Sequence, residues 1–263
     1  MQFFNLKHSD FPAALAAISQ AAGYTFADEG RLVSALTHSS YSAECPSHPQ
    51  PCNERLEFLG DSVLQLIVSE ALMKEFPDNQ EGDLSRFRSV LVDEEANASY
   101  ARQLGLPEAM LMGHGECITG GRANHSIQGD LFEAFLGAVY LDGGYEAARA
   151  VFLRLVPDVR GSALTMVPRK NPKGTLNNYV QEVERTTPVY AITGQSGPVH
   201  APLFDCAVTV HGVEVGKGSG STKKHAEEEA AIAALKFYKI LPEEGGREET
   251  PPPAEEGSSQ GTP

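Results

Sequence analysis

Cysteine, positive charge and long apolar runs are all scarce in this chain of 263 residues. Its 4 cysteines are too few for a disulfide framework at this length, which favours a reducing compartment. No apolar run approaches the length of a membrane span. The one early apolar stretch, residues 11–23, lacks the basic start and the cleavage site of a signal peptide. We therefore expect a cytoplasmic protein.

The shortage of positive charge leaves 21 Lys and Arg against 35 Asp and Glu, for a net charge of −14. As an average, this balance argues against a nucleic-acid partner. The average hides three regions of different charge, however. Residues 1–167 and 241–263 are acidic, whereas residues 168–240 carry 9 basic against 7 acidic residues. This mildly basic segment is compatible with a nucleic-acid partner.

The hydrophobic pattern predicts two domains. Apolar residues at three- and four-residue spacing predict an all-α domain over 1–156. The spacing is lost from residue 157, and because residues 157–174 contain three prolines we interpret 157–170 as a linker. Residues 171–240 predict an α+β domain of order α-β-β-β-α, whose last helix has Ser221 or Thr222 as its N-cap. Residues 241–263 are too polar and too rich in Pro and Gly to fold, so we expect a disordered acidic tail.

Acidic residues form a stripe on one predicted helix of the first domain. Glu54, Glu57 and Asp61 lie at i, i+3 and i+7, so they share one narrow face. A solvated acidic face is the plainer interpretation, but no Lys or Arg lies at i+4 to pair with them, and their neighbours are strongly apolar. Asp130 and Glu133 repeat the i, i+3 spacing inside a second apolar helix.

Carboxylates in such apolar surroundings are costly unless something compensates their charge, and divalent cations are the simplest compensation. Hard oxygen ligands without cysteine or histidine favour Mg²⁺ or Mn²⁺ over zinc. Such ions can activate a water and stabilise the leaving oxygen in phosphodiester hydrolysis. Spacing alone thus favours a metal site over a solvated face.

A second candidate metal motif directly precedes the acidic stripe. Cys45, His48 and Cys52 are ligands of the kind that zinc prefers. They supply only three ligands, and the three prolines of residues 45–52 restrict this loop without a metal. We therefore favour surface thiols over a zinc site.

Several stretches resemble the ribonuclease III family. Its signature is matched by NERLEFLGDS (53–62), and the flanking motifs by GYTFADEGRLVSALTHSSY (23–41), EGDLSRFRSVLV (81–92) and GECITGGRANHSIQGDLFEAFLGAVYLDGGY (115–145). The double-stranded-RNA-binding domain is matched by NPKGTLNNYVQ (171–181), GPVH (197–200) and GSGSTKKHAEEEAAIAAL (218–235). The resemblance covers residues 11–240 and implies an all-α endonuclease domain followed by a double-stranded-RNA-binding domain.

The resemblance also implies an activity. The family hydrolyses phosphodiester bonds of double-stranded RNA with Mg²⁺, for which Mn²⁺ may substitute, and leaves 5′-phosphate and 3′-hydroxyl ends. We accordingly expect a homodimeric endoribonuclease that processes ribosomal and other RNA precursors. A membrane and an organic cofactor are not expected.

The family's functional positions transfer to this chain residue by residue. Metal binding is expected at Glu57, Asp61, Asp130 and Glu133, of which Asp61 and Glu133 are also the expected catalytic residues, and auxiliary acids at Glu54 and Glu81. Gln181 and His200 are expected in the minor groove, Lys223 and Lys224 at phosphates, and Phe58 at the dimer interface, although Phe58 could equally be a core aromatic. One departure is Gln128–Gly129, where the family usually has Leu-Ala.

Two other classes of function are a non-catalytic RNA-binding regulator and a phosphohydrolase of small molecules. A non-catalytic regulator that only binds double-stranded RNA should lack at least one of the four metal-site acids, and all four are present. A magnesium phosphohydrolase of small molecules would leave the C-terminal domain without a role. Both are less consistent with the sequence than an endoribonuclease.

Overall fold

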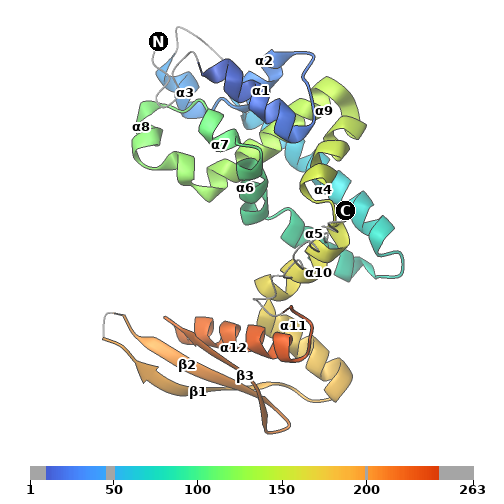
Figure 1. The fold of residues 1–263 in the computed structure, drawn as a ribbon, viewed down its shortest axis with the longest axis vertical. Coiled ribbons are helices and arrows are strands. Elements are labelled where there is room, and N and C mark those ends of the chain that lie inside the picture. Colours follow the sequence, from blue (N-terminus) through green and yellow to red (C-terminus); the bar gives the residue numbers. More distant parts are fainter. Residues whose placement is uncertain (1–9, 46–50, 199–200, 243–263) are drawn as a thin grey trace, which may run out of the picture. The chain divides into compact units, whose positions relative to one another are not determined.

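The structure, a computed structural model, describes residues 10–45, 51–198 and 201–242. It divides into two compact units, Met1–Asn171 and Pro172–Pro263 (Figure 1). The first unit is helical and the second has the order α-β-β-β-α, so the predicted fold class is confirmed. His48, His200 and residues 243–263 of the expected tail lie outside the described residues, whereas Leu241, the first residue of that tail, is buried in the core of the second unit.

The first unit is built around a long helix, α9. Its helices are α1 (Phe11–Ala22), α2 (Glu29–Ala35), α3 (Ser39–Glu44), α4 (Glu54–Glu75), α5 (Glu81–Leu91), α6 (Glu94–Gln103), α7 (Leu106–Ala109), α8 (His114–Ile118), the 3-10 helix η1 (Gly121–Ala123), α9 (His125–Leu155) and α10 (Val159–Lys170). A left-handed φ of 79° at Gly144 interrupts α9. Before this kink, the middle of α9 (residues 128–139) is mostly buried because the helix packs against α4, α6 and α2 (Figure 1).

Two glycines allow α4 and α9 to approach closely. A Cβ on Gly60 of α4 would lie 1.8 Å from the carbonyl oxygen of Glu133, and a Cβ on Gly137 of α9 would lie 2.2 Å from that of Leu56. Real Cβ atoms do not approach other atoms so closely, so any larger residue would separate the two backbones. This close contact therefore fixes where the acidic residues of α4 lie relative to those of α9.

The structure differs from the expected linker over 157–170. Most of this stretch forms α10, which packs on α5 and α4. Asp158 caps the helix by accepting a hydrogen bond from the Gly161 amide at 2.8 Å, and the helix buries Val159, Ala163 and Pro168. This burial compensates for the backbone hydrogen bond that Pro168 cannot donate within the helix. The two compact units divide after Asn171.

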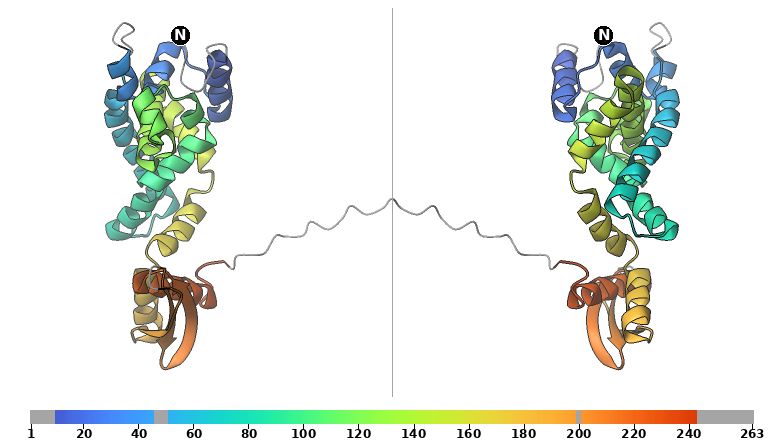
Figure 2. Two further views of the ribbon diagram at one scale, coloured as in Figure 1. Left: turned by 90° about the vertical axis from the view of Figure 1, so that its left-hand side faces the viewer. Right: turned by 90° about the vertical axis from the view of Figure 1, so that its right-hand side faces the viewer.

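The second unit packs two helices on one face of an antiparallel sheet (Figure 2). Its elements are α11 (Pro172–Tyr179), the π-helix η2 (Val180–Glu184), β1 (Val189–Ser196), β2 (Leu203–Val210), β3 (Val213–Gly220) and α12 (Lys223–Phe237), with strand order β1-β2-β3. Thr222 caps α12 through a hydrogen bond from the His225 amide at 3.1 Å, as one of the two predicted caps. Alanines of α12 form much of the core with Leu176, Val180 and Val208.

Across the ranges that the structure describes, no helix is both long enough and apolar enough to cross a bilayer.

Candidate active site

Three predicted metal ligands meet where α4 crosses α9. Glu57 comes from α4, and Asp130 and Glu133 lie one turn apart on α9. One carboxylate oxygen from each lies within 4.8 Å of the others. This is the one group of His, Cys, Asp and Glu with metal-binding spacing in the described part of the chain. All three residues are half-buried, which does not fit the alternative of a fully solvated acidic face.

The electrostatics of this three-residue group are unfavourable without a cation. Burial and the charges of Asp61, Asp130 and Glu57 raise the pKa of Glu133 to about 7. Burial and neighbouring carboxylates likewise raise the pKa of Glu57, and burial with the charge of Glu94 raises that of Asp130. Burial and mutual repulsion both disfavour the charged carboxylates. A divalent cation would remove both effects, because it replaces the lost hydration and neutralises the like charges. The donor set is all oxygen, so it fits Mg²⁺ or Mn²⁺.

The other predicted acids lie outside this group. Asp61 is exposed one turn along α4, close enough for its charge to raise the pKa of Glu133, and it accepts a hydrogen bond from Gln65 Nε2 at 3.4 Å. Glu54 is exposed at the start of α4, and its charge raises the pKa of Glu57. Glu81 begins α5 and accepts a hydrogen bond from Ser85 Oγ at 2.6 Å.

Asn97 is a residue of the site that the sequence pattern does not predict. This residue of α6 is 1% exposed, and its Nδ2 lies 2.8 Å from Glu133 Oε1. The only signal in the sequence is an asparagine between two alanines in ANASYA (96–101), which is weak because asparagine is common on exposed helix faces. Its contact with the site depends on a tertiary approach of α6 to α9.

The raised pKa of Glu133 predicts how stability depends on pH. Between pH 4.5, the ordinary value for this group, and about pH 7 the folded chain holds a proton that the unfolded chain has lost. Without metal, the free energy of unfolding should therefore fall by about 2 kcal/mol as pH rises through this window, after allowance for partial exposure. Above the window it should level off. Urea unfolding in EDTA from pH 5 to 8 measures this loss.

Two controls identify the source of the pH effect. Glutamine does not titrate, so subtracting the unfolding free energy of Glu133→Gln from that of the wild type isolates the effect of Glu133. This difference should fall with rising pH as described for the wild type. Saturating Mg²⁺ should reverse the trend, since the ion binds the deprotonated carboxylates. A wild-type curve that rises with pH in EDTA, while Glu133→Gln stays flat, would contradict the assignment.

The predicted RNA-binding residues all belong to the second unit. Lys223 and Lys224 are the first residues of α12 and both are exposed, with Lys224 Nζ 3.8 Å from Glu228 Oε1. Gln181 is exposed in the π-helix η2. Because helix N-termini favour anions, the two lysines reinforce a site that is already suited to phosphate.

Two further predictions concern the start of α4. Phe58 is 81% exposed, which excludes the alternative of a core aromatic. Cys45 and Cys52 are free and half-buried, and Cys52 Sγ donates a hydrogen bond to Glu54 Oε2 at 3.7 Å. Neither cysteine belongs to a group with metal-binding spacing among the described residues.

Both units match known protein families. Residues 28–159 match the family model described as ribonuclease-III-like, and residues 172–238 match that of the double-stranded RNA binding motif. A protein named ribonuclease 3 from Nitratidesulfovibrio vulgaris is 42% identical over 218 residues, which cover 83% of this chain and 86% of the relative. A ribonuclease 3 from Bacillus cereus is 40% identical over 218 residues, covering 82% and 88%.

A solved structure also matches the first unit. It is the nuclease domain of a ribonuclease III from Campylobacter jejuni, whose structure concerns flexibility in a region involved in dimer formation. The two share 39% identity with a TM-score of 0.51, and the match covers 56% of this chain and 99% of that domain. Both units and their order agree with these matches: the chain belongs to the ribonuclease III family.

Proposed function

We propose that this protein is a metal-dependent endoribonuclease that hydrolyses phosphodiester bonds of double-stranded RNA and leaves 5′-phosphate and 3′-hydroxyl ends. The observation that carries the proposal is the group of Glu57, Asp130 and Glu133, whose oxygens lie within 4.8 Å of one another in a chain that also has a double-stranded RNA binding motif. Ribosomal and other RNA precursors in the cytoplasm are the proposed substrates.

Each acid has a distinct place in the proposed mechanism. Glu57, Asp130 and Glu133 would hold Mg²⁺ or Mn²⁺, and a bound ion supplies a water of lowered pKa and charge neutralisation at the scissile phosphate. Asp61 lies outside the three-residue group and is exposed, where its carboxylate can orient a water or hold a second ion. Glu54 and Glu81 add negative charge at greater distance and are proposed as auxiliary acids.

The second unit supplies the attraction for RNA that the acidic first unit lacks. Lys223 and Lys224 are proposed to contact phosphates, while Gln181 and His200 are proposed to contact the minor groove. An A-form duplex exposes little sequence information in its minor groove, so the module should recognise duplex shape over about 16 base pairs. Cleavage should therefore depend on duplex length more than on sequence.

Cleavage of matched nucleic acids tests the proposal. With Mg²⁺, the protein should cut a long RNA duplex, but not the same sequence as single-stranded RNA or duplex DNA, and EDTA should abolish cutting. Ligation and phosphatase treatment identify the ends. Binding of RNA duplex with no cutting in Mg²⁺ or Mn²⁺ would support the non-catalytic regulator instead.

Replacing both Lys223 and Lys224 with alanine should weaken duplex binding at least about tenfold at physiological salt. The slope of log affinity against log salt should fall by about two, because two phosphate contacts are lost. Fluorescence anisotropy in Ca²⁺ at several salt concentrations measures both. Lys236→Ala, at the other end of α12, is the matched control and should change neither; an unaltered slope in the double variant would contradict the phosphate assignment.

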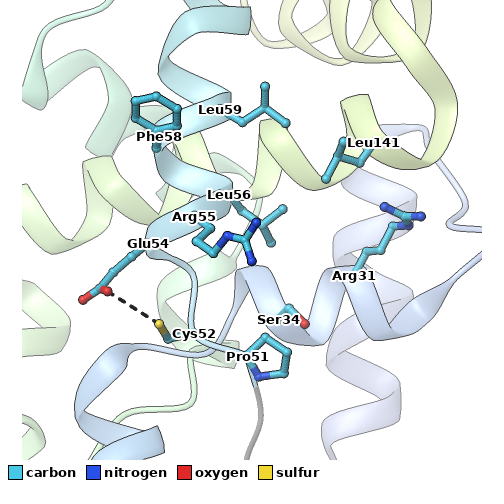
Figure 3. Close-up of a pocket in the computed structure, with 10 residues that line it drawn as sticks. All are labelled: Arg31, Ser34, Pro51, Cys52, Glu54, Arg55, Leu56, Phe58, Leu59 and Leu141. Carbon is cyan, nitrogen blue, oxygen red and sulfur yellow. Dashed lines mark hydrogen bonds between the residues drawn. The ribbon is translucent and has the colours of Figure 1, made fainter.

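Dimerisation is proposed through the exposed side of α4. Phe58, Leu66 and Met73 are exposed apolar residues that fall within a sector of about 80° on this helix. Phe58 lies at the edge of a hollow of about 740 Å³ that Leu59, Leu141 and other residues line (Figure 3). In a twofold dimer each copy presents both the exposed aromatic ring and the neighbouring hollow. The ring of one copy can therefore fit into the hollow of the other. Two sites related by twofold symmetry can also cut both strands of a duplex.

Replacing Phe58 with aspartate should shift the protein from dimer to monomer at micromolar concentration. A buried aromatic anchor typically contributes about 2 kcal/mol or more to an interface, and a carboxylate in its place would be desolvated without a partner. Light scattering measures the change. Phe237→Asp is the matched control, since Phe237 is 61% exposed in the second unit and should leave the dimer intact. A wild-type monomer would contradict the proposed interface.

A further inference from the structure

Asn97 is a buried polar residue in an otherwise apolar environment. It is 1% exposed on α6, where its neighbours Ala96, Ala98, Tyr100 and Ala101 are also buried. Its Nδ2 donates to Glu133 Oε1 at 2.8 Å and to the Val92 carbonyl oxygen at 3.3 Å. Because both partners are acceptors, the amide nitrogen must face them, and the orientation of the side chain is fixed.

This arrangement is not what core packing alone would select. Asn97 Oδ1 is buried and has no hydrogen-bond partner among the residues that the structure describes. An unpaired buried acceptor is destabilising, whereas an apolar residue of the same shape would avoid that penalty. The amide is thus retained at a cost to packing, and what it provides is a hydrogen bond to Glu133.

The position of Asn97 is itself well determined. Asp93 caps α6 by accepting a hydrogen bond from the Ala96 amide at 2.9 Å, and Lys170 of α10 lies 3.2 Å from the same carboxylate. On the other side, α6 packs on α9 at Gly129, where a Cβ would meet the Cβ of Asn97 at 3.6 Å. The amide therefore reaches Glu133 from a rigid element rather than from a loop.

We propose that Asn97 is a positioning residue that holds Glu133 in place for metal binding. Without an ion, the carboxylate of Glu133 is repelled by Asp61, Asp130 and Glu57. A fixed donor at Oε1 opposes this displacement and keeps the side chain in the geometry that the ion needs. This role rests on the proposed metal site, but it adds a residue whose contribution can be tested separately.

Titration of the full chain with Mn²⁺ alone, without RNA, tests the role by calorimetry. Asn97→Leu has the same number of side-chain heavy atoms but no donor, and it should weaken Mn²⁺ binding by at least about tenfold, the usual effect of losing an outer hydrogen-bond partner of a ligand. Ser99→Ala, two residues along α6, should bind as wild type does. Asn97→Ala adds no bulk and should show the same loss of Mn²⁺ affinity. It replaces Asn97→Leu in the test if Asn97→Leu does not fold.

A second readout separates positioning from a structural role. In single-turnover cleavage of duplex RNA, the slowed Asn97→Leu should recover towards the wild-type rate as Mn²⁺ is raised. Urea unfolding in EDTA, where no ion stabilises the fold, should give this variant an unfolding transition, whereas a folding defect would show there as a variant already unfolded without urea. Wild-type Mn²⁺ affinity in folded Asn97→Leu or Asn97→Ala would overturn the positioning role. Failure of the wild type itself to bind Mn²⁺ would instead overturn the metal site.

Discussion

Replacing Glu133 with glutamine is expected to abolish cleavage of duplex RNA and to leave RNA binding intact. Glutamine keeps the size of the side chain but removes the charge of a carboxylate that shares the three-residue group with Glu57 and Asp130. Loss of an outer-shell partner typically costs 10- to 100-fold, so loss of a ligand should cost roughly 10³-fold or more in the single-turnover rate. Quench-flow cleavage of an end-labelled duplex in saturating Mg²⁺ measures the rate.

The matched control makes the same chemical change elsewhere on the same helix. Glu146 follows the kink of α9 and its side chain is 82% exposed, so Glu146→Gln should cleave at the wild-type rate. Both variants should bind duplex RNA in Ca²⁺ as the wild type does, because the proposed RNA contacts lie in the second unit. A Glu133→Gln variant that cuts at the wild-type rate would contradict the site assignment.

Replacing Gly60 with alanine should have the largest effect on the fold. The added Cβ would lie 1.8 Å from the Glu133 carbonyl oxygen, so α4 and α9 must separate at the point that carries the acids. Overpacking typically costs about 1–3 kcal/mol, and a clash between two backbones should lie at or above the upper end. Urea unfolding measures the stability, and Mn²⁺ titration should show weaker binding because Glu57 moves away from α9.

Gly129→Ala is the matched control for that substitution. A Cβ there would meet its nearest atom, the Glu94 carbonyl oxygen, at 3.4 Å, which is close to ordinary contact. Because alanine favours a helix over glycine, Gly129→Ala should stabilise the protein by about 0.5–1 kcal/mol. If Gly60→Ala were as harmless as Gly129→Ala, the close contact of α4 and α9 would not hold the site together.

The parts of the site that follow from local geometry could be predicted from sequence. The spacing of Glu57 and Asp61 fixes their common face as soon as the segment is helical, and the same holds for Asp130 and Glu133. That the two pairs meet could not be derived from spacing. It depends on Gly60 and the contact it permits between helices far apart in the chain, so only the family resemblance predicted it.

In α10, tertiary packing overrides the local preference of the sequence. Prolines suggested a linker over 157–170, yet α10 tolerates Pro168 because the helix buries that residue against the first unit. Asp158 is a typical N-cap residue and is the one signal in this stretch that favours a helix start. Asn97 could not be identified from sequence either, because its link to the site is a tertiary hydrogen bond to Glu133.

The most direct test of the account is the location of a bound ion. Anomalous diffraction from a crystal of the wild-type protein soaked in Mn²⁺ should show a peak about 2.0–2.2 Å from carboxylate oxygens of Glu57, Asp130 and Glu133, with Asn97 Nδ2 still donating to Glu133. Absence of a peak at this group, or a Mn²⁺ ion held by other residues of the chain, would contradict the central claim that these acids form the metal centre.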